Sequence, residues 1–179
     1  MNEITWRNDD VSFRTDFNQF KEVQELFNKY NVTHTIALIC KDIDRNPALI
    51  EYINANNVDV QIHCWEHVDL TLDLEQTRSD LYNSAATIYA NFYKLPQIVY
   101  PPWNISIPEL EDLCEEFECS VSNKKISLSQ YMKAFGDVKE DTINFHSWHE
   151  PDRFMLESAL KIYDKRRKQL SEEDKLKCL

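Results

Sequence analysis

The sequence predicts an α/β domain built on a parallel sheet. Short apolar runs of strand length alternate with longer segments in which apolar residues recur every three or four positions, as in amphipathic helices. The run at residues 35–40, Thr-Ile-Ala-Leu-Ile-Cys, is continuously apolar, which suits a sheet buried on both faces. This alternation is typical of parallel strands joined by right-handed helical crossovers. The pattern alone leaves two architectures open, an open doubly wound sheet and a closed barrel.

In the first half of the chain we expect strands over residues 4–6, 35–40 and 58–62, and helices over residues 16–30, from Pro47 onward, and from Asp73 to about Lys94. Proline suits the first turn of a helix, so Pro47 marks a helix start. Asp73 can cap the third helix, with Gln76 at the reciprocal capping-box position.

In the second half we expect strands over residues 97–100, 119–122 and 142–145, and helices over residues 106–118, 127–135 and from Pro151 onward. Ser106 is the expected cap of the first of these helices. The 179 residues suffice for one domain with a proper core. We assign that domain to residues 1–165 and expect a charged C-terminal tail over residues 166–179.

The composition excludes several classes of function. A formal net charge of -11 argues against a nucleic-acid partner, and a single glycine rules out glycine-rich phosphate-binding loops. The five cysteines are odd in number and irregularly spaced, which indicates free thiols in a reducing compartment. We see neither a signal peptide nor an apolar run long enough to span a membrane. We therefore expect a cytoplasmic protein with no membrane partner.

The segment His63-Cys64-Trp65-Glu66-His67 directly follows the strand expected over residues 58–62. Two imidazoles four residues apart can reach one metal ion from a single turn of chain. The same spacing also occurs by chance on solvated helices. The segment is not the zincin motif, which requires glutamate directly after the first histidine.

Other polar and aromatic residues also stand at expected strand ends. Asp9 and Asp10 follow the first strand, Trp103 follows the strand over residues 97–100, and His146 follows the last strand. Carboxyl ends of parallel strands share one face, so these residues should converge with the histidine pair. Each has a plainer interpretation as well. The two aspartates could form a turn, His146 could be a half-buried histidine, and Trp103 could be a core aromatic.

The motifs resemble those of the polysaccharide deacetylases of the NodB-homology type, carbohydrate esterase family four. The family's Thr-Phe-Asp-Asp-Gly is similar to residues 7–11, and its His-[Ser/Thr]-x-x-His to residues 63–67. Its Arg-x-Pro-aromatic turn is similar to residues 100–103, and its apolar strand ending in histidine to residues 143–146. The similarity extends over roughly residues 4–149. The second motif, with Val-Asp-Leu-Thr following it, is the most specific part.

The resemblance implies a deformed (β/α)7 barrel, a relative of the eight-stranded TIM barrel. It also implies a divalent metal held by Asp10, His63 and His67, with Asp9 as general base and His146 as general acid. Zinc is our expectation from the ligand types, with cobalt, nickel or manganese as alternatives.

The implied reaction is removal of an acetyl group from an N- or O-acetylated sugar. Asp9 would take a proton from water activated by the metal, and His146 would protonate the leaving group. His149 is a rival for the acid role. The residues expected to contact the substrate are Trp65, Tyr100, Pro102, Trp103, Trp148 and His149.

Three departures from the family pattern keep alternatives open. Tyr100 stands where the family has the motif-three arginine, Val11 replaces the glycine of the first motif, and only Trp148 is a candidate for the fourth motif. Arg7 could supply the missing charge unless side-chain alternation points it elsewhere. The alternatives are a metal-dependent amidohydrolase acting on a small amide, and a non-catalytic barrel that binds carbohydrate or protein.

Overall fold

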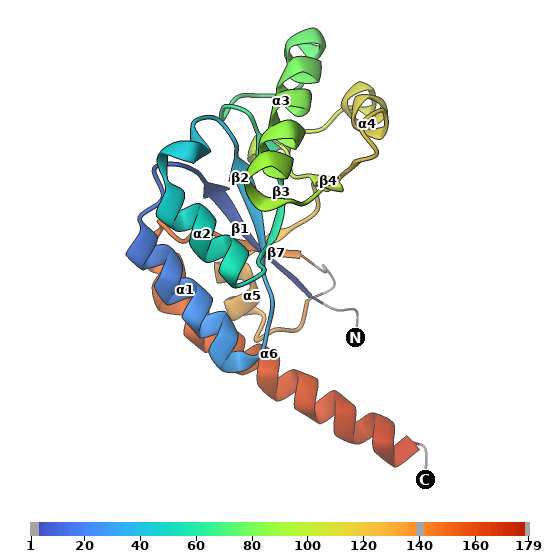
Figure 1. Ribbon diagram of the computed structural model, residues 1–179. Helices are drawn as coiled ribbons and strands as arrows, with labels where there is room; N and C mark the ends of the chain where they lie inside the picture. The colour runs from blue at the N-terminus through green and yellow to red at the C-terminus, as the bar shows by residue number, and fades with distance from the viewer. Residues whose placement is uncertain (1–3, 139–141, 178–179) are drawn as a thin grey trace.

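The computed structural model describes residues 4–138 and 142–177, and within them seven strands form one parallel sheet (Figure 1). The strands follow the order β5-β4-β3-β2-β1-β7-β6. Their bounds are Thr5–Val11 (β1), Thr35–Ile39 (β2), Asp59–Cys64 (β3), Ile98–Val99 (β4), Ser120–Val121 (β5), Ile126–Ser127 (β6) and Thr142–Phe145 (β7). Among the described residues β5 and β6 do not pair, so the curled sheet is the deformed (β/α)7 barrel that the resemblance implies. The predicted parallel α/β sheet is confirmed.

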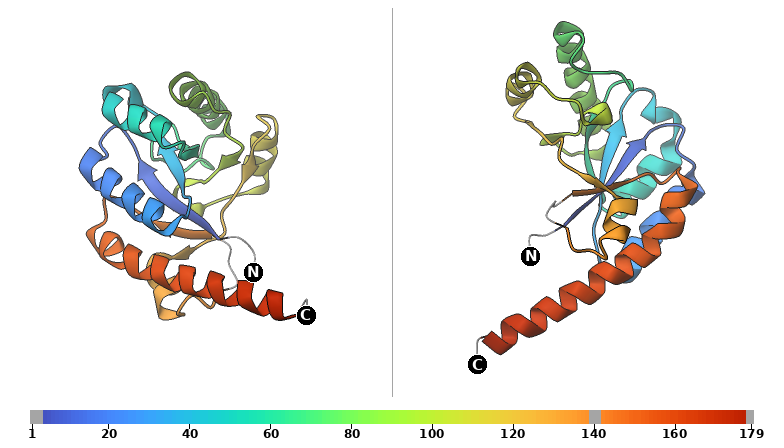
Figure 2. Two further views of the ribbon diagram at one scale, coloured as in Figure 1. Left: turned by 60° about the horizontal axis from the view of Figure 1, so that its bottom comes forward. Right: turned by 180° about the vertical axis from the view of Figure 1, so that it is seen from behind.

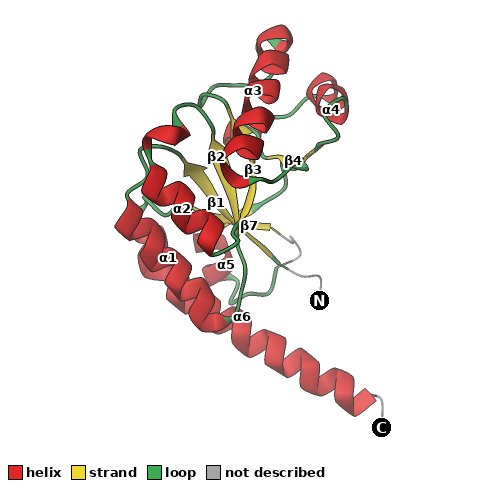
Figure 3. Ribbon diagram, viewed as in Figure 1, coloured by secondary structure: helices red, strands yellow, loops and turns green. Residues whose placement is uncertain are grey.

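The helices lie on the outside of this curled sheet (Figure 3). Their bounds are Phe17–Tyr30 (α1), Pro47–Ala55 (α2), Leu74–Phe92 (α3), Pro108–Glu115 (α4), Leu128–Lys133 (α5) and Glu150–Lys177 (α6). The last helix packs along α1 and then extends away from the sheet (Figure 2). None of the described helices combines the length and apolar character that a membrane-spanning helix requires.

Capping side chains explain where two of the predicted helices begin. The carboxylate of Asp16 accepts a hydrogen bond from the backbone N–H of Gln19 at the start of α1. Asp73 accepts in the same way from Gln76 at the start of α3, as the sequence predicted, but the Gln76 side chain donates to Asp80 and does not complete the expected capping box. These bonds satisfy backbone donors that a helix leaves unpaired in its first turn.

Several predicted boundaries were wrong. Ser106 does not cap α4; its hydroxyl donates to the Glu111 carboxylate, and Ile107 stands at the cap position. That helix ends at Glu115, three residues early, because Glu118 turns into the left-handed region with φ 58°. The two-residue strand β6 was not predicted. The expected tail begins inside α6, which is helical as far as Lys177, so the division at residue 165 stays a prediction.

The packing of Trp6 determines which way β1 faces. Trp6 is fully buried and makes edge-to-face contacts with Phe27, Tyr131 and Tyr163, at centroid distances of 5.9, 5.5 and 5.7 Å. These rings belong to α1, α5 and α6, outside the sheet. Because side chains alternate along a strand, the neighbouring Arg7 points into the barrel.

Candidate active site

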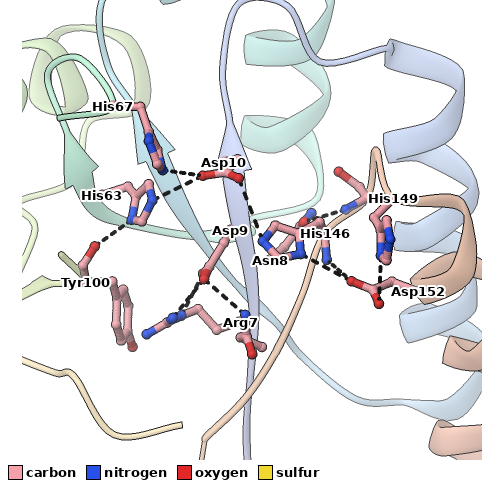
Figure 4. Close-up of polar contacts among 12 residues, drawn as sticks. Arg7, Asn8, Asp9, Asp10, His63, His67, Tyr100, His146, His149 and Asp152 are labelled. Carbon is pink, nitrogen blue, oxygen red and sulfur yellow. Dashed lines mark hydrogen bonds and ion pairs between the residues drawn. The ribbon is translucent and has the colours of Figure 1, made fainter. Parts of the chain in front are cut away.

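Five of the residues predicted for the site converge at the carboxyl ends of the strands (Figure 4). Asp9 and Asp10 lie near the end of β1, and His63 lies near the end of β3. His67 lies in the loop after β3, and His146 directly follows β7.

An irregularity in β1 brings both aspartates to the same site. Adjacent residues on a regular strand point to opposite faces. Here Asn8 pairs with Ile36 while Val11 pairs with Leu38, so β1 carries one extra residue and forms a bulge. Asp10 lies within this bulge with φ 62°, in the left-handed region. The bulge turns its carboxylate toward the histidines while Asp9 still faces the barrel interior.

Asp10, His63 and His67 have the geometry of a metal site. Asp10 Oδ1 lies 3.1 Å from His63 Nε2 and 3.2 Å from His67 Nε2, and one atom from each residue can be chosen so that all lie within 4.8 Å of one another. His63 Nδ1 hydrogen-bonds the carbonyl oxygen of Tyr100, which leaves Nε2 as the free ligand atom. One carboxylate oxygen and two imidazole nitrogens therefore fit a divalent ion such as zinc.

The ionisation of this group suits metal binding. Burial lowers the pKa of His67, against an opposing effect of the Asp10 charge, so its imidazole stays neutral and free to bind a metal at neutral pH. Burial alone would raise the pKa of the Asp10 carboxyl, but the hydrogen bond with His63 and the nearby histidine charges lower it overall. Asp10 is therefore an ionised ligand.

Asp9 is held by Arg7, two residues earlier on the same strand. Arg7 Nε donates to Asp9 Oδ1 at 2.6 Å and Nη2 donates to Oδ2 at 2.7 Å. Arg7 is fully buried and Asp9 is 3% exposed. The guanidinium also lies over the ring of Tyr100, 4.5 Å from its centroid. Arg7 thus supplies the positive charge beside Asp9 that is missing at position 100, where this chain has tyrosine in place of the family's arginine.

His146 is held by Asp152, a residue that the sequence analysis missed. Asp152 Oδ2 accepts from the backbone N–H of His146 at 2.8 Å and lies 3.2 Å from its Nδ1. The other carboxylate oxygen lies 3.1 Å from His149 Nδ1, so both histidines share one partner. Burial raises the pKa of Asp152, but hydrogen bonds from the two histidines outweigh it and the net shift is downward. An acidic residue in the first turn after Pro151 was the only sequence signal for this role.

The opposite ring nitrogen of His146 faces the metal site. Nε2 lies 3.7 Å from Asp10 Oδ2. The loop that carries His146 is tied to β1, because the buried side chain of Asn8 accepts a hydrogen bond from the backbone N–H of Ser147 at 2.9 Å. Asn8 therefore replaces the family's aromatic residue with a loop anchor.

The residues predicted to bind substrate divide into an exposed and a buried set. Trp103 is 59% exposed with its ring 4.7 Å from that of His67, and Trp148 is 52% exposed with its ring 5.1 Å from that of His146. Tyr100 and Pro102 are buried, and Trp65 is partly buried against the core. His149 is also exposed at the rim.

A cavity of about 380 Å³ opens beside this centre and is lined by Asp10, Ser12, Arg14, Thr15, Ile39, His67 and Trp148. A larger cavity of about 600 Å³, beside α4 and β5, contains none of the candidate site residues. Size alone would therefore point to the wrong place, and the chemistry of the lining residues identifies the candidate site.

Comparison with protein families agrees with this geometry. A sequence profile described as polysaccharide deacetylase matches residues 9–106, more than half of the chain. No curated protein shows significant sequence similarity to this chain.

Solved structures share the fold at low sequence identity. A mutant of BA3943 from Bacillus anthracis, a CE4 family pseudoenzyme with restored activity, superposes with a TM-score of 0.79 at 15% identity, over 91% of this chain and 63% of that one. The peptidoglycan deacetylase PdaC from Bacillus subtilis gives 0.75 at 15% identity, over 98% and 92%. A family 4 carbohydrate esterase from Streptomyces lividans in complex with acetate gives 0.75 at 12% identity, over 92% and 88%. The chain thus spans less than two thirds of the BA3943 structures.

Proposed function

Because the chain belongs to the polysaccharide deacetylase family, we propose that it hydrolyses an acetyl group from an N- or O-acetylated sugar. One observation carries the proposal. The Asp10–His63–His67 group lies beside a carboxylate, Asp9, and a histidine, His146, that can act as base and acid.

Asp10, His63 and His67 would hold the divalent ion, for which zinc remains our choice. Such an ion supplies a Lewis acid that lowers the pKa of water to about 7 in favourable sites and polarises a carbonyl group. The neutral imidazole of His67 and the ionised carboxylate of Asp10 are the protonation states that this binding requires.

Asp9 is the general base in this proposal. Arg7 engages both of its oxygens, which fixes the plane of the carboxylate and keeps it from rotating away from the site. The lone pairs that the guanidinium leaves free accept the proton from the attacking water.

His146 is the general acid in this proposal. With Nδ1–H donated to Asp152, its Nε2–H points into the site and can protonate the leaving nitrogen or oxygen. Trp103, beside His67, and Trp148, beside His146, present exposed aromatic rings for contact with a sugar.

An assay with paired substrates tests the proposal. The zinc-loaded protein should release acetate from acetylated oligosaccharides, and the Asp9→Asn and His146→Ala variants should be much slower. Hydrolysis of small amides or imides in place of sugars would favour the amidohydrolase alternative. A bound metal with no hydrolysis of any of these compounds would favour the non-catalytic binding barrel.

A further inference from the structure

Arg7 connects three parts of the site through one buried guanidinium. Beyond its two bonds to Asp9 and its position over the Tyr100 ring, Nη2 donates to Asn104 Oδ1 at 2.9 Å. The side chain of Arg7 is inaccessible to solvent, so water does not compete for these bonds. Asn104 lies in the short 3₁₀ turn Pro102–Asn104 that follows β4.

That turn has an unfavourable backbone conformation. Trp103 and Asn104 are both left-handed, with φ of 53° and 59°. Asparagine tolerates this region, whereas a bulky residue such as tryptophan adopts it only when its surroundings hold it there. The turn has two backbone hydrogen bonds of its own, from Asn104 to Pro101 and from Ile105 to Pro102. The bond from Arg7 to the Asn104 side chain is its connection to the barrel interior.

The same turn carries Trp103. Its indole meets the ring of His67 edge to face, with an interplanar angle of 83°, while more than half of the side chain remains exposed. An exposed ring at the rim is thus linked, through the neighbouring Asn104, to an arginine inside the barrel.

We propose that Arg7 is a positioning residue for two functional groups at once, fixing the base Asp9 and, through Asn104, the rim indole of Trp103. The catalytic part rests on the proposed function, because it takes Asp9 as base and Trp103 as a substrate contact. The structural part, the link from Arg7 through Asn104 to Trp103, does not depend on that function. A change at Asn104 should therefore disturb both Trp103 and the orientation of Asp9, and lower kcat as well as raise KM.

Fluorine NMR of the full chain labelled with 5-fluorotryptophan measures the structural part without any substrate. The four tryptophans give four signals, and Trp103→Phe identifies that of Trp103. Asn104→Gly keeps the left-handed backbone but removes the side-chain acceptor. Arg7→Lys keeps the charge but loses the planar fork that reaches Asp9 and Asn104 together. Both variants should shift or broaden the Trp103 signal and leave that of the buried Trp6 unchanged.

Two further variants serve as controls. Asn57 is also left-handed, with φ 50°, and lies just before β3, so Asn57→Gly makes the same substitution away from Arg7. It should leave the Trp103 signal and the rate as in the wild type. Asn104→Asp retains an oxygen acceptor for Arg7 and should keep the Trp103 signal near its wild-type position.

Steady-state kinetics on N-acetylglucosamine oligomers then test the catalytic part. Asn104→Gly should lower kcat by roughly 10-fold to 10²-fold, because small misplacements of catalytic groups have effects of that size. An unmoved Trp103 signal in both Asn104→Gly and Arg7→Lys would overturn the structural coupling. A moved signal with unchanged kcat would overturn the catalytic part. If the signal moves as expected but even the wild type hydrolyses no acetylated compound, the coupling stands and the proposed function fails.

Discussion

Asp9 and His146 both lie close to Asp10, yet they are supported by regions of very different character. Asp9 is held by a residue two positions away on the same strand, and both partners are buried. His146 is held by Asp152, six positions away across a loop, and its side chain is 26% exposed. The base is fixed in the buried interior, whereas the acid is partly exposed to solvent. A general acid must regain its proton in every turnover, so contact with solvent suits its role.

The largest effects should come from the two adjacent aspartates. Asp10→Asn should remove both metal and activity, because two imidazoles alone bind a divalent ion poorly. Asp9→Asn should keep the metal and lower kcat by about 10²–10⁴, the usual contribution of a general base. Metal content measured by plasma mass spectrometry distinguishes the two variants, with His63→Ala and His67→Ala as further metal-free references. Equal metal loss in both aspartate variants would contradict this division of roles.

The next effect separates the two histidines that share Asp152. His146→Ala should lower kcat on an amide by about 10²–10⁴ and should affect substrates with better leaving groups less. His149→Ala should have a smaller effect with no such dependence, since His149 contacts Asp152 whereas His146 Nε2 faces Asp10. Rates on a series of acetyl esters and amides provide the measurement. If the leaving-group dependence followed His149 instead, the two roles would have to be exchanged.

Stability should show the same contrast between the two sides. Arg7→Met leaves the Asp9 carboxylate buried and unpaired, which should lower the free energy of unfolding by about 3–5 kcal/mol. Asp152→Asn removes a charge whose own side chain is 12% exposed but whose partners, His146 and His149, are 26% and 44% exposed, so solvent screens these pairs and the cost should be about 1 kcal/mol. Urea denaturation of the metal-free protein at pH 7 measures both. Equal losses in the free energy of unfolding would show that the Arg7–Asp9 pair contributes no more to stability than the contacts of Asp152.

The smallest effect is the contribution of Asp152 to the pH dependence of stability. The folded protein lowers the pKa of Asp152 below the value near 3.9 expected for the unfolded chain. Its stabilisation is therefore complete above about pH 4 and is lost as the pH falls through the lower folded value. The stability difference between the wild type and Asp152→Asn should shrink below pH 4. A difference that persisted at pH 2 would exclude this ion pair as its source.

Much of the site could be predicted because its residues stand at the ends of recognisable strands. The histidine pair and His146 were placed by the apolar runs before them, and parallel strands gather such residues on one face. The sequence left open where strand alternation would point Arg7; in the structure Arg7 and Asp9, two residues apart, lie on the same face of β1 and form an ion pair. The bulge at Asp10 could not be foreseen, because the left-handed residue is Asp10 itself. In the family motif the glycine, the residue that adopts this conformation most easily, corresponds to the next position, Val11.

The contacts that support the site were harder to predict, since they join residues without a local pattern. Asp152 meets His146 only because α6 begins beside the end of β7. Asn104 meets Arg7 across 97 residues through a turn of two successive left-handed residues. A two-residue strand such as β6 is too short to show the alternation on which strand prediction depends.

The placement of Cys64 has a consequence for which metal the protein would take up. The thiol lies between the two candidate histidine ligands in sequence, but it packs into the core, and burial raises its pKa well above the usual range. It therefore offers no thiolate to attract a soft ion such as Cu(I). With only oxygen and nitrogen donors, discrimination among nickel, cobalt and zinc would rest on geometry and on the supply of each ion in the cell. The metal found in the purified protein would then depend on the growth medium as well as on the site.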